Sequence, residues 1–212
     1  MIQRLQTFAT GKNVLIFLAL DLILMMGVMP FLGSKMEAVS TISGKPIDLE
    51  IPTYSTERAH SMIEGYGEAG REIYQLIELT ADIAYPIVYS LAFALLILFL
   101  LKKMELGNHW LRWLAMIPFV TAFADLGENI SIVMMLNQFP VQSDVVAQIA
   151  GSFSLVKWSC FFLSLGSILL GLAGWALSGF KRKSNPKINS KIKPVYGISY
   201  LCVYSYISQT EI

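Results

Sequence analysis

The chain has 212 residues, of which 55% are hydrophobic and 15% charged, and its mean hydropathy is +0.57. This composition is too apolar for an ordinary water-soluble domain. The apolar residues stand in long runs, and a run of about 20 crosses a bilayer as a helix. The two cysteines, Cys160 and Cys202, form no C-x-x-C or zinc-ligand spacing, which argues against thiol-redox and cysteine-metal chemistry. We therefore predict an all-α, multi-pass integral membrane protein.

The first apolar run extends from Val14 to Leu32 and follows Arg4 and Lys12. A basic segment before an apolar run is typical of a signal anchor, and no A-x-A cleavage site follows this one. We expect the run to be retained as the first membrane span.

The next segment, 33–78, is predicted to be an extracytoplasmic loop, because it is polar and carries eight acidic against four basic side chains. Within it, apolar residues recur at helical spacing from Met62 to Ile77, which predicts an amphipathic helix capped by Ser55 or Thr56. Three glycines weaken this helix: Gly65, Gly67 and Gly70.

Three further apolar runs predict spans at about 79–101, 111–136 and 149–177. The N-terminus, the second link and the tail, 181–212, are basic, whereas the first and third connections are acidic or nearly uncharged. Basic residues in short loops stay in the cytoplasm, so we expect a cell-membrane protein with both termini cytoplasmic. The short second and third connections predict an up-down four-helix bundle, with 1–180 as a single transmembrane domain.

A polar cluster interrupts the third span: Asp125, Glu128 and Asn129 stand at i, i+3 and i+4. Each ionisable group placed at the centre of a bilayer costs about 2.5–3.5 kcal/mol on insertion scales. The spacing puts all three side chains on one helix face, where they can point into the bundle instead of at lipid.

The predicted topology brings Lys157 and Asp82 to the depth of this cluster. Lys157 is expected to pair with Glu128 or Asp125, and Asn129 to complete the hydrogen bonds. Two of the three carboxylates are then left for Arg71, a cation or a proton.

The face of the second span that carries Asp82 continues with Tyr85 and Tyr89, at i+3 and i+7. The two hydroxyls are expected to join the hydrogen bonds of the cluster. Pro86 lies between them, and a proline inside a helix bends it and frees a backbone carbonyl.

Two interpretations of these charges remain open. Buried polar residues in membrane bundles often only hold helices together, yet ionisable residues inside a membrane are by default functional candidates. Asp21, alone in the first span, faces either the same cavity or a partner protein. His60 is a possible base on the outer loop, although a lone loop histidine is more often simply solvated.

Three motifs follow one another on the four-helix frame: Gly67-x-x-Gly70-Arg71-x-x-Tyr74, Asp82-x-x-Tyr85-Pro86-x-x-Tyr89 and Asp125-x-x-Glu128-Asn129. Over roughly 64–136 the chain resembles an uncharacterised family of small four-helix polytopic membrane proteins. The resemblance implies that the three motifs form a unit and attaches no activity to them. The frame is also similar to that of membrane thiol oxidoreductases, but the missing cysteine pairs argue against that chemistry.

The leading hypothesis is an acid-lined intramembrane cavity that binds a proton, a cation or a small polar or lipid ligand. The alternatives are an intramembrane enzyme acting on a lipid or isoprenoid at the outer leaflet, and an assembly or regulatory subunit of a membrane complex. No catalytic residue, metal ligand set or cofactor is indicated. The expected partners are the lipid bilayer and a second copy or another membrane protein, and not nucleic acid. The expected ligand or proton site consists of Asp82, Tyr85, Tyr89, Asp125, Glu128, Asn129, Lys157 and Arg71.

Overall fold

The computed structural model describes residues 2–41, 45–104 and 109–184, and in these residues it is helical with no strand. The chain divides into two units, Met1–Leu172 and Ala173–Ile212. The C-terminal end of the predicted basic tail, from 185 onward, lies outside the described residues. The residues that form the candidate site all belong to the first unit.

The first long helix is built from consecutive segments. A short helix, α1 (Ile2–Phe8), precedes α2 (Gly11–Ile23), whose N-terminus is capped by the Thr10 hydroxyl. A π-helical stretch, Leu24–Val28, joins α2 to α3 (Met29–Glu37). This helix is therefore longer than the predicted span.

The first connection is folded rather than open. It contains a 3₁₀ turn (Ile47–Leu49) and α4 (Thr56–Gly65), and the hydroxyl that caps α4 is that of Ser55, which accepts from the Arg58 N–H. Gly67 follows with a φ of +68°, a conformation that side chains with a Cβ rarely adopt. The amphipathic segment is therefore split into two helices, α4 and α5 (Gly67–Leu79).

The remaining helices are α6 (Ala81–Lys103), a 3₁₀ segment (His109–Met116) that leads into α7 (Ile117–Gln138), and α8 (Asp144–Ser184). Four stretches are long and apolar enough to cross a membrane, which is compatible with a multi-pass membrane protein. The second one begins at Gly67 and not at 79, because α5 runs directly into α6. The four stretches are Gly11–Glu37, Gly67–Lys103, Trp110–Gln138 and Asp144–Leu177.

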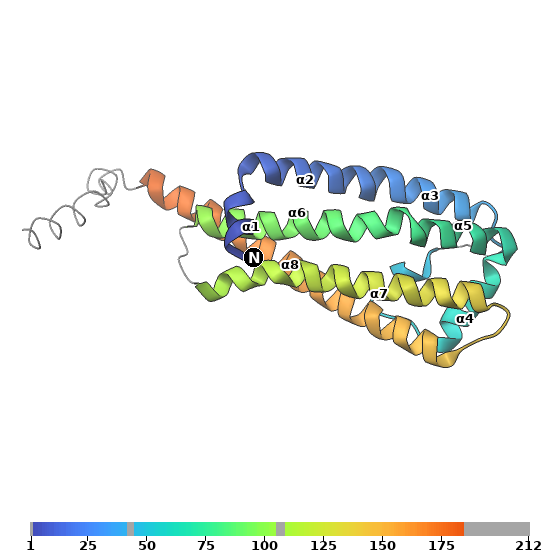
Figure 1. Ribbon diagram of the computed structural model, residues 1–212. Helices are drawn as coiled ribbons and strands as arrows, with labels where there is room; N and C mark the ends of the chain where they lie inside the picture. The colour runs from blue at the N-terminus through green and yellow to red at the C-terminus, as the bar shows by residue number, and fades with distance from the viewer. Residues whose placement is uncertain (1, 42–44, 105–108, 185–212) are drawn as a thin grey trace, which may run out of the picture. The chain divides into compact units, whose positions relative to one another are not determined.

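The helices of the first unit lie side by side (Figure 1). Helix α2 packs along α6 and α3 along α5, so these two long helices run in opposite directions, and α7 packs against both α5 and α6. Helix α8 approaches α7 closely at Gly127, where an added Cβ would stand only 2.7 Å from the Phe153 ring. The glycine of the central polar motif is thus required by helix packing.

Two apolar clusters fill the interior. One joins the folded first connection to α5, α7 and the start of α8, and includes Met36, Tyr66 and Ile132. The other joins α2, α6, the 3₁₀ segment that precedes α7, and α8, and includes Val14, Leu98 and Ile168. The polar residues of α6, α7 and α8 fall between the two clusters along each helix, so they form a layer within an apolar interior.

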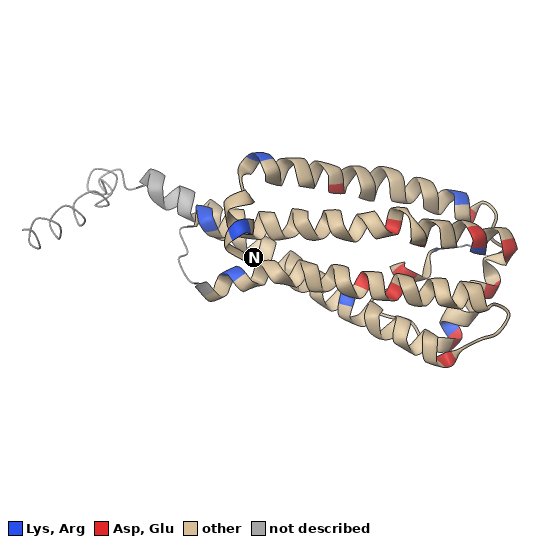
Figure 2. Ribbon diagram, in the orientation of Figure 1, with Lys and Arg blue, Asp and Glu red and all other residues tan. Residues whose placement is uncertain are grey.

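The charges are also distributed unequally between the two ends. Lys12 opens α2 and Lys102 and Lys103 close α6, and these ends lie together because Gly11 faces Phe99. Figure 2 shows that most of the acidic residues lie in the half of the bundle that holds α4 and α5.

Candidate functional site

Lys157 of α8 is the centre of the polar layer. Its Nζ lies 3.2 Å from Asp125 Oδ1 and 2.5 Å from Glu128 Oε2, and it donates to the backbone carbonyl of Asp48 at 3.0 Å. The side chain of Glu128 is fully buried, and those of Lys157 and Asp125 are each 8% exposed. One ammonium group therefore faces two carboxylates, so this trio carries a net negative charge when all three groups are ionised.

The tyrosines of α6 extend the trio. Tyr89 donates to Asp125 Oδ2 at 3.0 Å, and Tyr85 packs edge-on against the Tyr89 ring with 5.2 Å between ring centroids. The Asp125 carboxylate is thus bound on one oxygen by Lys157 and on the other by Tyr89.

Asn129 of α7 donates a hydrogen bond to a backbone carbonyl of α6 that Pro86 leaves without a helical partner. Because Pro86 has no N–H, the carbonyl of Asp82, four residues earlier, loses its helical partner. The Asn129 side chain donates to that carbonyl at 2.8 Å. Pro86 therefore frees a backbone carbonyl, as expected, and the Asn129 amide of the Asp125-x-x-Glu128-Asn129 motif donates a hydrogen bond to it.

Arg71 does not lie in this group. Its guanidinium stacks 3.8 Å from the centroid of the Phe139 ring and donates to the Ile63 carbonyl. In this position Arg71 holds α5 to the end of α7 and does not neutralise the carboxylates of the layer.

Three buried residues of the first connection and α5 reach the layer although the predicted site did not include them: Asp48, Glu78 and Tyr74, the last of which stands in the first of the three sequence motifs. Tyr74 donates to Asp48 Oδ1 at 2.6 Å. The sequence contains a signal for two of them, because Tyr74, Glu78 and Asp82 are spaced four residues apart and continue the stripe of Tyr85 and Tyr89. Asp48 has no such signal, because it stands in a polar loop.

Tyr54, from the same connection, is buried beside Glu128. Burial first, and then the nearby Glu128 carboxylate, raise the pKa of Tyr54 far above its usual value. Tyr54 is therefore a neutral hydroxyl at physiological pH.

A hollow of about 550 Å³ opens beside the trio. Asp21 of α2 lies on its wall, so it faces the same space as the residues of α6 and α7. The hollow has five acidic side chains and one lysine: Asp21, Asp48, Glu78, Asp82, Asp125 and Lys157. The rest of the wall is largely apolar, and includes Met25, Met29, Phe93, Trp158 and Phe161.

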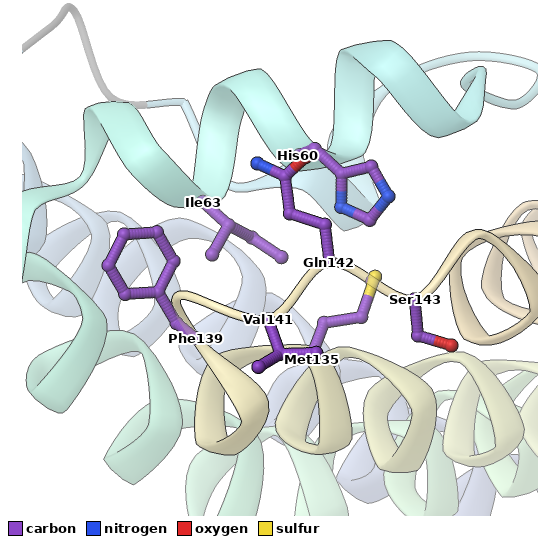
Figure 3. A pocket seen from close by; sticks show the side chains of 7 residues that line it. All are labelled: His60, Ile63, Met135, Phe139, Val141, Gln142 and Ser143. Carbon is purple, nitrogen blue, oxygen red and sulfur yellow. The ribbon is translucent and has the colours of Figure 1, made fainter.

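A second, much smaller pocket lies where α4 meets the loop between α7 and α8 (Figure 3). His60 and Gln142 are on its wall, and its volume of about 10 Å³ leaves room for no more than one water molecule. His60 Nε2 lies 3.1 Å from Asp144 Oδ1, so His60 joins α4 to the start of α8. We regard this pocket as a structural contact and the hollow beside Lys157 as the candidate site.

Fold and site together define an all-helical chain with four potential membrane spans and a buried, acid-rich polar layer. Comparison with protein-family models, with curated proteins and with solved structures finds no match to the chain.

Proposed function

We propose that the protein is a multi-pass membrane protein whose acid-lined hollow binds a proton, a cation or a small polar or lipid ligand within the bundle. The observation that carries this proposal is the imbalance of charge on the wall, where five carboxylates face one lysine. Buried charges are stable only when they are paired or neutralised. A wall of this composition therefore favours an occupant that brings positive charge.

The size of the hollow supports the same proposal. Small-molecule sites usually enclose roughly 300–1,000 Å³ and combine an apolar wall with a few polar groups. The hollow beside Lys157, at about 550 Å³, has both properties.

We also propose an orientation in which the end of the bundle with Lys12, Lys102 and Lys103 faces the cytoplasm. Basic residues at the ends of spans favour the cytoplasmic side. The hollow would then lie between the middle of the membrane and the opposite face.

Trp158 provides a direct test, because it lines the hollow. Replacing Trp110, Trp113 and Trp175 with phenylalanine leaves Trp158 as the only tryptophan. The emission of this variant in lipid nanodiscs is recorded while pH, sodium, potassium or a bromine-labelled alkyl probe is varied. We expect at least one of these to change the emission saturably.

The matched control keeps only Trp113, which is 65% exposed. It should respond to the alkyl probe in proportion to partitioning into lipid, without saturation. If Trp158 behaves in the same way as Trp113 with every titrant, the hollow is not a binding site and the proposal is wrong.

A further inference from the structure

Glu78 is an acidic group of the hollow to which no described residue donates a hydrogen bond. Its side chain is 1% exposed, it lines the hollow, and neither carboxylate oxygen has a hydrogen-bond partner among the described residues. Tyr74 is a neighbour, but a hydroxyl has a single proton and Tyr74 donates it to Asp48. A buried carboxylate without donors is unfavourable unless a ligand or a proton completes it.

Lys157 cannot complete Glu78. Its ammonium group is ion-paired with Asp125 and Glu128 and donates to the Asp48 carbonyl. The charge of Lys157 is thus used within the trio. Glu78 and Asp82, which is 3% exposed, make up a second acidic part of the same wall.

The rest of the wall indicates what kind of cation would fit. A bare metal ion needs oxygen ligands at about 2.0–2.6 Å and occupies little space, whereas the hollow measures about 550 Å³. Met25, Met29, Phe93 and Phe161 offer apolar surface to most of that space. Aromatic faces such as these also attract organic cations.

We infer that the hollow binds an organic cation with an ammonium head and an apolar body, the head against Glu78 and Asp82 and the body against the methionines and aromatic rings. This inference rests on the proposed function and names the ligand class for the same site. Anionic lipid head groups are disfavoured there, because the wall would repel them.

The test compares three probes of equal chain length on the Trp158-only protein in nanodiscs of zwitterionic lipid: dodecylammonium, dodecanol and dodecanoate, each carrying bromine on the chain as a quencher. We expect dodecylammonium to quench Trp158 saturably and at least about tenfold more tightly than the other two, a factor that corresponds to about 1.4 kcal/mol. Glu78→Gln should weaken the binding of dodecylammonium by about tenfold or more.

The matched control is Glu72→Gln, which makes the same change on an exposed face of α5 and should alter the affinity by less than about twofold. Asp82→Asn, at the second carboxylate of this part of the wall, should weaken the binding of dodecylammonium in the same way. Equal weakening by Glu72→Gln and Glu78→Gln would overturn the inference, because the attraction would then be a general surface effect.

The remaining outcomes separate this inference from the proposed function. Saturable quenching by dodecanol or dodecanoate as strong as that by dodecylammonium would keep the hollow as a ligand site and overturn the ligand class. A response of Trp158 to pH alone would also overturn the proposed ligand class, because the carboxylates would then bind protons and not an organic cation. Absence of any saturable response would overturn both.

Discussion

Lys157 shows at the scale of a single residue how the polar layer is held together. Its ammonium group forms ion pairs with the Asp125 and Glu128 carboxylates and donates to the Asp48 carbonyl, and both carboxylates lie in an apolar interior. Removing one partner of a buried ion pair costs about 3–5 kcal/mol, because the other is left uncompensated.

Lys157→Met is therefore expected to lower the free energy of unfolding by about 3–5 kcal/mol. Unfolding by denaturant in detergent measures this loss, with the exposed Lys102→Met as the control. Adding Asp125→Asn and Glu128→Gln to Lys157→Met should recover much of the loss. A single Lys157→Met variant as stable as the wild type would show that the trio is not an ion-pair network.

Tyr89→Phe removes the hydroxyl that donates to Asp125. Hydrogen bonds to charged groups contribute about 1.5–3 kcal/mol, so we expect a loss of that size in the same unfolding assay. Tyr85→Phe is the control, because the structure shows Tyr85 in a ring contact. Equal losses from the two substitutions would contradict the assigned role of the Tyr89 hydroxyl.

The residues of the site differed in how well they could be predicted. Asp125, Glu128 and Lys157 stand out because each interrupts a long apolar run, where an ionisable side chain is energetically costly and therefore rare. Asp48 lies in a segment rich in exposed acidic residues, where sequence alone does not separate a buried carboxylate from its solvated neighbours, and only its contacts with other elements reveal it. Glu78 lies in the same segment, and its one signal in the sequence is the four-residue spacing from Tyr74 and Asp82.

At the scale of elements, the contact between Pro86 of α6 and Asn129 of α7 links two of the three sequence motifs. The proline frees the carbonyl of Asp82, and the amide binds it. The two residues should therefore be energetically coupled.

Asn129→Ala is expected to cost about 1–3 kcal/mol, because it leaves a buried carbonyl without a donor. In a Pro86→Ala background a backbone N–H is restored at position 86 and can bind that carbonyl, so Asn129→Ala should then cost much less. A double-mutant cycle of unfolding free energies measures the difference. Strictly additive effects would contradict the coupling.

The elements themselves could be predicted where hydropathy decides them, and the four apolar runs all correspond to helices. The ends of these helices could not be predicted, because α3 and α5 continue them with amphipathic turns that contain charged residues. Gly67 is a further case: composition indicates a weak helix there, whereas the break at this residue depends on its positive φ.

At the scale of the whole molecule, two apolar clusters enclose one polar layer, and most of the acidic residues lie toward the end opposite to Lys12, Lys102 and Lys103. This separation leads to a prediction of orientation. In a background of Cys160→Ser and Cys202→Ser, a membrane-impermeant thiol reagent added to intact cells should label Glu68→Cys and leave Lys102→Cys unlabelled. Both positions are exposed in the structure, so the reverse pattern would contradict the proposed orientation.

The central claim is that the acid-rich hollow is a working site, and the unfolding free energy of Glu78→Gln tests it most directly. A carboxylate kept for binding, without partners of its own, lowers stability. Glu78→Gln without ligand should then be at least as stable as the wild type at neutral pH, while Glu72→Gln stays within about 0.5 kcal/mol of it. A loss of more than about 1 kcal/mol in Glu78→Gln alone would show that the carboxylate supports the fold, and would contradict the claim.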